Sequence, residues 1–197
     1  MNKKLVAATH NKGKLREFSR ILEPLGIELV PVPEGIMETI EETGSTFAEN
    51  AVIKAKAVFA ATGIPTMADD SGLCIDALGG EPGVKSARFM GEDTSYTIKN
   101  AKIIEMLEGI SDEKRTARFV CAIAVAHQNG ENVFEGAFEG KIGYEAKGDN
   151  GFGYDPIFYV GEISSSEMSA EQKDSMSHRG KALRAMAKEI NDIIQGE

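Results

Sequence analysis

Two adjacent acidic residues are the candidates for metal chemistry in this sequence. Residues 67–72 read MADDSG, so Asp69 and Asp70 follow an apolar lead-in. Two carboxylates are costly to bury together without a cation, and their hard oxygens suit Mg²⁺, which also takes phosphate oxygens as ligands. Glu42, in an acidic connection at residues 33–45, could join them if the fold brings it near. A solvated acidic turn is the competing interpretation.

Residues 9–14 are a candidate anion-binding loop. They read THNKGK and lie between an apolar run and a helix. Amide groups at a helix N-terminus bind anions, Gly13 permits close approach of a ligand, and Lys14 adds a positive charge. Thr9 and Asn11 add hydrogen-bonding groups. The spacing is not that of a Walker A loop, so a capped helix with surface lysines explains the motif equally well.

A glycine-flanked aromatic ring is the candidate for base recognition. Residues 150–155 read NGFGYD. Glycines on both sides of Phe152 would expose its ring for stacking, and Asp155 could contact a base edge. The alternative is a tight loop whose aromatic rings fold into the core.

Further basic residues extend these candidates. Lys173 and the pair His178-Arg179, at the start of the last helix, could donate hydrogen bonds to an anion or a carbonyl oxygen. Ser177 beside His178 does not indicate a serine hydrolase, because adjacent residues rarely align as nucleophile and base and no Gly-X-Ser-X-Gly turn surrounds them. Lys54, on the polar face of an earlier helix, is another candidate, and a solvated surface lysine is its usual alternative.

Strands that alternate with helices must position these residues. Strands are predicted at residues 5–8, 27–32, 116–127, 132–142 and 156–160, with two short strand pieces at 67–69 and 73–76 around a turn. Helices are predicted after residue 14 until Pro24 and Gly26 stop the first, from the capping-box spacing at residues 46–49 to about residue 62, at 94–107 and at about 178–194. On the third of these helices Ile98, Ala101, Ile104 and Leu107 are expected to face inward. This order predicts an α/β fold with a mixed central sheet and flanking helices.

Composition excludes several classes of protein. The chain has 197 residues, 42% of them apolar, and a net charge of −9, which argues for a globular protein and against an extended basic surface for nucleic acid. No run approaches the roughly 18 apolar residues of a membrane span, so no membrane partner is expected. Cys74 and Cys121 belong to no metal-type pair and are expected to be reduced, buried thiols, which suits the cytoplasm.

The motifs together resemble the inosine/xanthosine triphosphate pyrophosphatases over nearly the whole chain. The resemblance rests on blocks in the family's order, at residues 9–14, 41–44, 47–55, 68–73, 82–83, 86–88, 151–156 and 177–179. It implies Mg²⁺-dependent hydrolysis of ITP, dITP and XTP to the monophosphate and pyrophosphate, which cleanses the nucleotide pool. It also implies one elongated, two-lobed domain over residues 1–197 with a cleft between the lobes, and a homodimer. Lys85 departs from the family, which usually has an aromatic residue there.

The resemblance also implies a role for each matching residue. Thr9, His10, Asn11, Lys12, Gly13 and Lys14 would bind the triphosphate, and Lys54 and Ser71 would contact phosphate. Glu42 and Asp70 would hold the metal. Asp70 would also accept the proton of the attacking water, with Asp69 sharing that work. Phe152, in the loop with Gly153 and Tyr154, would stack on the purine, and Asp155, Lys173, His178 and Arg179 would surround the base and read its 6-oxo edge.

Two other functions stay open at this point. A non-catalytic nucleotide sensor would keep the binding residues but would have no need of a water-activating acid. A pyrophosphatase for other modified nucleotides would keep the same chemistry with a different base preference.

Overall fold

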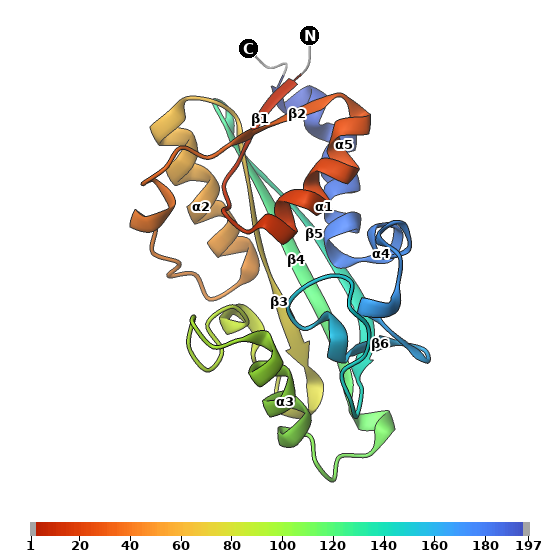
Figure 1. Cartoon of the computed structure of the whole chain (residues 1–197). Coiled ribbons are helices and arrows are strands. Elements are labelled where there is room, and N and C mark those ends of the chain that lie inside the picture. The colour runs from red at the N-terminus through yellow and green to blue at the C-terminus, as the bar shows by residue number, and fades with distance from the viewer. Residues whose placement is uncertain (1–2, 195–197) are drawn as a thin grey trace. The chain divides into compact units, whose positions relative to one another are not determined.

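The protein is built on one mixed β-sheet, as the computed structural model shows for residues 3–194 (Figure 1). The strand order is β2-β1-β3-β4-β5-β6-β7. The strands are β1 (Lys3–Ala7), β2 (Ile27–Pro31), β3 (Thr66–Ile75), β4 (Thr116–His127), β5 (Gly130–Ile142), β6 (Phe158–Val160) and β7 (Ile163–Ser164). β1 pairs in parallel with β2 and β3, whereas β5–β6 and β6–β7 are antiparallel. The predicted α/β class with a mixed sheet is confirmed.

The helices are α1 (Lys12–Leu22), α2 (Phe47–Thr62), α3 (Tyr96–Met106), α4 (Ala170–Met176) and α5 (His178–Ile194). The four for which bounds were predicted, α1, α2, α3 and α5, begin and end close to those positions. The capping box at the start of α2 is present: the Glu49 amide donates to Thr46 Oγ1 at 3.1 Å, and the Glu49 carboxylate accepts from the Thr46 amide. Gly63, with a φ of 67°, ends the same helix in the left-handed conformation. Among residues 3–194 no helix combines the length and apolar character needed to cross a membrane.

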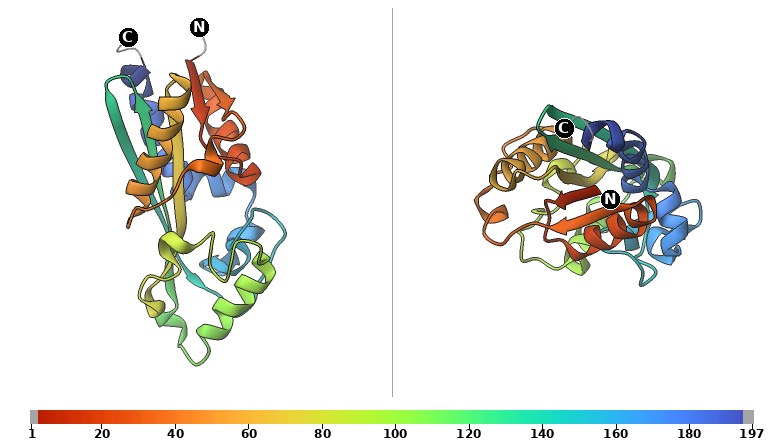
Figure 2. Two further views of the ribbon diagram at one scale, coloured as in Figure 1. Left: turned by 90° about the vertical axis from the view of Figure 1, so that its left-hand side faces the viewer. Right: turned by 90° about the horizontal axis from the view of Figure 1, so that it is seen from above.

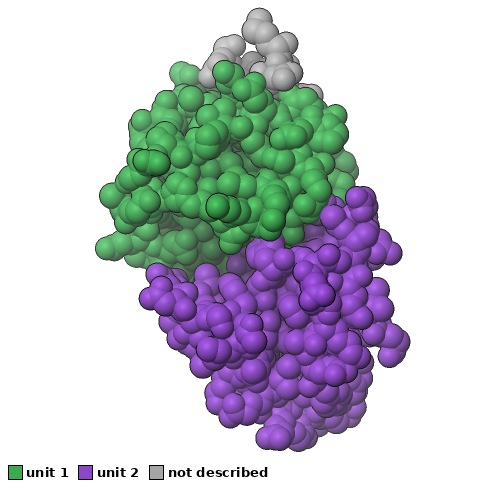
Figure 3. Space-filling view, in the orientation of Figure 1, with its two compact units in different colours: residues 1–70, 121–136, 178–197 green, residues 71–120, 137–177 purple. Residues whose placement is uncertain are grey.

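The chain forms two compact units (Figure 3). Unit 1 contains residues 1–70, 121–136 and 178–197, and unit 2 contains residues 71–120 and 137–177. The chain passes between them along β3, β4 and β5, each of which carries residues of both units. The single domain over residues 1–197 and the cleft between two lobes stay predictions.

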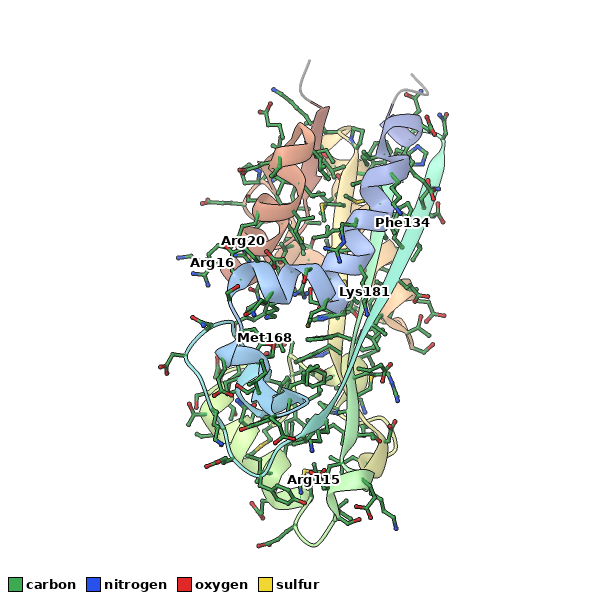
Figure 4. All side chains as sticks on the ribbon, turned by 90° about the vertical axis from the view of Figure 1, so that its right-hand side faces the viewer. Arg16, Arg20, Arg115, Phe134, Met168 and Lys181 are labelled. Carbon is green, nitrogen blue, oxygen red and sulfur yellow. The ribbon has the colours of Figure 1, made fainter. Side chains whose placement is uncertain are left out.

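Unit 1 packs helices on both faces of its part of the sheet (Figure 2). On β4, Cys121, Ile123 and Val125 face a core with α1 and α5, and the alternate residues Ala122, Ala124 and Ala126 face a core with α2. Successive strand residues point to opposite faces, and alanines let α2 lie close to the strand. Phe134 of β5 belongs to the α1–α5 core and lies beside α5 in Figure 4.

Unit 2 has a core of its own. Leu73 and Ile75 of β3, Phe119 of β4 and Phe138 of β5 pack against Ile103 and Leu107 at the end of α3. Arg115, labelled in Figure 4, is 1% exposed, and its guanidinium donates to the carbonyls of Leu107, Ile142 and Gly143 at 2.7–2.8 Å. These bonds provide hydrogen-bond partners for backbone carbonyls at the end of α3 and the end of β5, which would otherwise be buried without a partner.

One prediction about local structure was wrong and another held only in part. Residues 67–69 and 73–76 are not separate strand pieces around a turn, because β3 runs unbroken through residues 66–75. Of the residues expected to face inward from α3, Leu107 is buried and Ile104 packs against the core, but Ile98 is 55% exposed and Ala101 is also exposed. Lys99 and Asn100 are buried instead, because their side chains donate to the backbone carbonyls of Ala87 and Gly153.

Candidate functional site

Asp69 and Asp70 point to opposite faces of β3. They follow Met67, which belongs to the core with α1 and α5, and Ala68, which belongs to the core with α2. Side chains alternate along a strand, so Asp69 faces α1 and α5 and Asp70 faces α2. The neighbouring acids therefore sit in two different environments, and each has its own set of basic partners.

Asp69 is the centre of a buried ionic network. Its Oδ2 accepts from Arg179 Nε of α5 at 2.8 Å and from the Cys121 thiol of β4 at 3.1 Å, and its Oδ1 pairs with Lys14 Nζ of α1. Arg179 Nη1 donates in turn to Glu17 Oε2 at 2.5 Å. Burial alone raises the pKa of Asp69, but the charges of Arg179 and Lys14 outweigh it and hold the pKa well below its usual value. Burial and the same carboxylate raise the pKa of the Cys121 thiol.

Asp70 shares one lysine with Glu42. Lys54 Nζ of α2 lies 3.1 Å from Asp70 Oδ1 and 2.9 Å from Glu42 Oε1, and Asn50 Nδ2 donates to Asp70 Oδ2 at 3.3 Å. Burial raises the pKa of Asp70, the charge of Glu42 raises it further, and Lys54 and Lys14 only partly offset these effects. Burial also lowers the pKa of Lys54, but the charges of Asp70, Glu42 and Asp69 outweigh it and raise that pKa. Asp70 is thus the aspartate that holds a proton more readily.

Lys54 uses its full set of donors. An ammonium group has three N–H bonds, and those of Lys54 reach Asp70 Oδ1, Glu42 Oε1 and the Asp69 carbonyl, the last at 3.0 Å. Lys14 Nζ also donates to the Asp69 carbonyl, at 3.3 Å. Lys54 is only 5% exposed. It is therefore not the solvated surface lysine that was the alternative interpretation of this residue.

Close packing before α2 brings Glu42 to this lysine. The Gly44 amide donates to Asn50 Oδ1 at 2.8 Å, and a Cβ at residue 44 would lie 2.7 Å from the same oxygen. Only glycine allows that approach without displacing Asn50. Asn50 is fully buried and bonds both Gly44 and Asp70, so it ties the acidic connection to β3.

The loop at residues 9–14 caps α1. Asn11 is the N-cap, and its Oδ1 accepts from the Gly13 amide at 2.9 Å and the Lys14 amide at 3.1 Å. Thr9 Oγ1 accepts from the Asn11 amide at 3.1 Å. The Gly13 and Lys14 amides, which could bind an anion, therefore already have a partner within the loop. The Lys14 ammonium points inward and pairs with Asp69. His10 and Lys12 are exposed.

The first turn of α5 lies directly on β5. A Cβ at Gly136 would come within 2.2 Å of the His178 carbonyl, so this glycine is what lets the helix approach the strand. His178 and Arg179 are 4% and 3% exposed. Arg179 extends from here to Asp69 and Glu17, and its charge is engaged within unit 1.

In unit 2 the two aromatic rings of the loop at residues 151–155 differ in exposure. Tyr154 is 4% exposed and donates its hydroxyl to the Ser86 carbonyl at 2.7 Å, so it belongs to the core. Phe152 is half-buried, and Lys173 Nζ lies 5.1 Å from the centre of its ring. The expectation of a core ring holds for Tyr154, and stacking on the Phe152 ring stays a prediction.

Asp155 organises that loop. Its Oδ2 accepts from the Phe152 amide at 2.8 Å and from Lys173 Nζ at 2.6 Å, and its Oδ1 accepts from Ser165 Oγ at 3.1 Å. Asp155 and Lys173 are 2% and 5% exposed. The Asp155 carboxylate therefore fixes both the Phe152 backbone and the Lys173 ammonium that lies beside the Phe152 ring.

The predicted residues thus gather in two groups. The charged cluster of unit 1 contains Lys14, Glu42, Lys54, Asp69, Asp70 and Arg179, and the aromatic loop of unit 2 contains Phe152, Asp155 and Lys173. Ser71 follows Asp70 on β3. Sequence reasoning missed Glu17, Asn50 and Ser165. The pair Asn50 and Lys54, one turn apart on α2, is the signal that could have indicated buried polar contacts.

Comparisons with known proteins give consistent results. A sequence model of the Ham1 family matches residues 5–189. A protein of Desulforamulus reducens named dITP/XTP pyrophosphatase is 50% identical over 195 residues, which cover 96% of each chain. A protein of Bacillus subtilis with the same name is 47% identical over 190 residues, covering 94% of this chain and 96% of the relative.

Solved structures agree with these relatives. A HAM1 protein from Coxiella burnetii has a TM-score of 0.84 and 40% sequence identity and covers 96% of this chain and 99% of its own. The Ham1 protein of Staphylococcus aureus has a TM-score of 0.85 and 38% identity over the same shares. Sequence and fold therefore agree that this chain belongs to the Ham1 family.

Proposed function

We propose that this protein hydrolyses the triphosphates of deaminated purine nucleosides, ITP, dITP and XTP, to the monophosphate and pyrophosphate. The observation that carries the proposal is the buried pair of neighbouring aspartates, one neutralised by Lys14 and Arg179 and the other left with a raised pKa beside Glu42. The curated relatives named dITP/XTP pyrophosphatase support the substrate class.

A divalent cation fits the donor set at Glu42 and Asp70. The two carboxylates already converge on one cationic group, the Lys54 ammonium, at 2.9 and 3.1 Å. Among the described residues no three acidic, histidine or cysteine side chains group as a metal site. Two carboxylates suffice for Mg²⁺, which keeps several waters and takes substrate phosphates as its remaining ligands. A bound Mg²⁺ would supply charge neutralisation and a more acidic water.

Asp70 is the proposed proton acceptor for the attacking water. A general base must reach the attacking water, and a raised pKa makes a carboxylate a better proton acceptor. The Asp70 side chain is 10% exposed and its pKa is raised, whereas the Asp69 side chain is fully buried and its pKa is lowered. We therefore infer that Asp69 contributes to the reaction by fixing Lys14 and Arg179 in place.

The basic residues of unit 1 would bind the triphosphate. The protein has a net charge of −9, so a polyanion needs a local positive field. Lys14, Lys54 and the first turn of α1 supply it, with Ser71 as a further donor. Because all three N–H bonds of Lys54 are in use, contact with phosphate requires the release of one acceptor. Glu42 and Asp70 are the carboxylates that would leave Lys54 if they held a cation instead.

The aromatic loop of unit 2 would bind the base. Phe152 offers a ring for stacking, and Lys173 is an ammonium donor held by Asp155 beside it. Hypoxanthine and xanthine present O6 as an acceptor where adenine presents an amino group, so a donor facing that position would be left unpaired by ATP. An unpaired buried donor can give about 10⁴-fold discrimination. His178 is a second candidate donor.

The direct test measures pyrophosphate release from ITP, XTP, GTP and ATP, each with Mg²⁺ and with EDTA. Metal-dependent release from ITP and XTP well above that from GTP and ATP is expected. Binding of ITP without release from any of the four would instead support the sensor. Release that is greatest from a modified nucleotide outside this set would support a pyrophosphatase of another base preference.

Assembly and location follow as part of the same proposal. We infer a homodimer that acts in the cytoplasm, where its nucleotide substrates are found. Cys74 and Cys121 are free thiols, which is consistent with a reducing compartment. Light scattering of the purified protein tests the dimer.

A further inference from the structure

Asn100 is a buried polar residue with one unsatisfied atom. It lies in the middle of α3 and is 4% exposed. Its Nδ2 donates to the Gly153 carbonyl at 3.2 Å, while its Oδ1 is buried and has no hydrogen-bond partner within the described part of the chain. A buried acceptor without a partner costs free energy that an apolar side chain of similar size would not. Packing alone therefore does not explain an asparagine here, and the bond to Gly153 is its distinctive contact.

The bond to Gly153 secures the backbone on the far side of Phe152. Gly153 has a φ of +69°, and the neighbouring Tyr154 ring packs edge-on against Tyr96 of α3 at 5.1 Å between ring centres. The Phe152 amide is held from the other side, by Asp155 Oδ2 at 2.8 Å. Phe152, the residue proposed to stack on the base, thus lies between two hydrogen-bonded backbone anchors, one from Asp155 and one from Asn100.

A ring used for stacking gains from such anchoring. Phe152 is only half-buried, and glycines on both sides leave its backbone conformationally free. Each anchor removes freedom that would otherwise be lost when a base binds, and preorganisation of this kind increases affinity without a new contact to the ligand.

We propose that Asn100 is a positioning residue for base recognition, which acts by fixing the Gly153 carbonyl and hence the Phe152 ring. The proposal rests on the proposed function, in which the aromatic loop binds the base and the charged cluster binds the phosphates. A change at Asn100 on α3 should therefore affect binding of the nucleoside part of the substrate and leave binding of the phosphates unchanged.

Asn100→Leu is the informative variant, because leucine removes both the donor and the unsatisfied oxygen at similar volume. Loss of one hydrogen bond is expected to raise KM for ITP about three- to tenfold with kcat within about twofold. The inhibition constant of IMP should rise by the same factor, that of pyrophosphate should stay unchanged, and Tm should be equal or higher. Asn100→Asp places a carboxylate oxygen opposite the Gly153 carbonyl and should raise KM further.

Lys99→Met is the matched control. Lys99 is the preceding residue of α3 and is 1% exposed, but its Nζ donates to the Ala87 carbonyl at 2.7 Å and not to the aromatic loop. Its variant is expected to lose stability while the inhibition constants of IMP and pyrophosphate both keep the parent's values.

The outcomes separate the two proposals. Absence of ITP turnover in the parent protein would overturn the proposed function, and this needs no variant. With an active parent, an Asn100→Leu protein that keeps the parent's KM and IMP inhibition would overturn the role of Asn100. Equal weakening of IMP and pyrophosphate would also overturn it, since that indicates a general structural loss. If the leucine variant fails to fold, Asn100→Ser provides the same comparison.

Discussion

Asp69→Asn should destabilise the protein far more than Asp70→Asn, although the two residues are neighbours with the same side chain. The Asp69 side chain is fully buried and accepts from Arg179, Lys14 and Cys121. An amide of the same shape leaves the two cations without their shared carboxylate. Removal of one member of a buried ion pair costs about 3–5 kcal/mol. We expect the lower end, about 3 kcal/mol, because Glu17 still pairs with Arg179.

The neighbouring position should tolerate the same change. Burial and the charge of Glu42 raise the pKa of Asp70, so its negative charge is disfavoured in the folded state. In Asp70→Asn, Lys54 keeps Glu42 at 2.9 Å, and the amide oxygen can still accept from Lys54 in place of Asp70 Oδ1. We expect the free energy of unfolding to change by less than about 1 kcal/mol.

The contribution of Asp69 should also depend on pH in a defined direction. Its pKa is lower in the folded than in the unfolded protein, so its stabilisation is complete above the ordinary value of 3.8 and is lost as the pH falls toward the folded value. The difference in stability between the parent and Asp69→Asn should be constant between about pH 5 and pH 8 and should shrink below about pH 4.

Calorimetry in EDTA measures these differences without a contribution from bound metal. For a chain of this length about 1 kcal/mol corresponds to 2–4 °C, so Asp69→Asn should lower Tm by about 6–12 °C and Asp70→Asn by less than about 4 °C. Equal losses from the two variants, or a loss of less than about 1 kcal/mol for Asp69→Asn, would refute the assignment of the ionic network to one face of β3.

Three further outcomes are expected. Asp70→Asn should lower kcat for ITP by about 10²- to 10⁴-fold, the usual contribution of a general base, with unchanged far-UV circular dichroism; parent-like turnover contradicts the role. Phe152→Ala should raise KM by about 5- to 150-fold, since stacking on a base contributes about 1–3 kcal/mol, and KM equal to the parent's argues against stacking. Lys54→Met should tighten Mn²⁺ binding in the absence of nucleotide, measured by titration calorimetry, because it frees Glu42 and Asp70 from their shared lysine. Lys14→Met is the control, since it removes the same charge without a direct bond to either carboxylate. An equal gain in Mn²⁺ affinity in Lys14→Met would refute the idea that the cation and Lys54 compete for these carboxylates.

The helices could be predicted well because the residues that begin and end a helix lie within or next to its first and last turns. Thr46 and Glu49 form a capping box within one turn, and Gly63 ends the same helix. The strand predicted at residues 116–127 is likewise reproduced by β4, which spans Thr116–His127. Such features need no knowledge of the rest of the fold.

The interior of the candidate site depends on distant partners, so the sequence could not predict it. Two aspartates and a glycine interrupt the apolar pattern of residues 66–75, and pattern alone therefore favoured a turn. Arg179, 110 residues away from Asp69, and Lys14, 55 residues away, are what allow an acid to lie inside the strand. The same holds for Asn100 on α3, which polarity would assign to solvent although the Gly153 carbonyl keeps it inside.

The side chains of β3 also determine how this protein tolerates a change in chain length. Odd and even positions along the strand face different helices. The face therefore decides whether a carboxylate is neutralised by basic residues and has a lowered pKa, as at Asp69, or has a raised pKa, as at Asp70. A single residue inserted within the strand between Thr66 and Asp69 would turn both carboxylates to the opposite faces, away from their basic partners. Two inserted residues would restore the faces but move each carboxylate about 6.6 Å along the strand. The length of β3 before this pair should therefore be fixed.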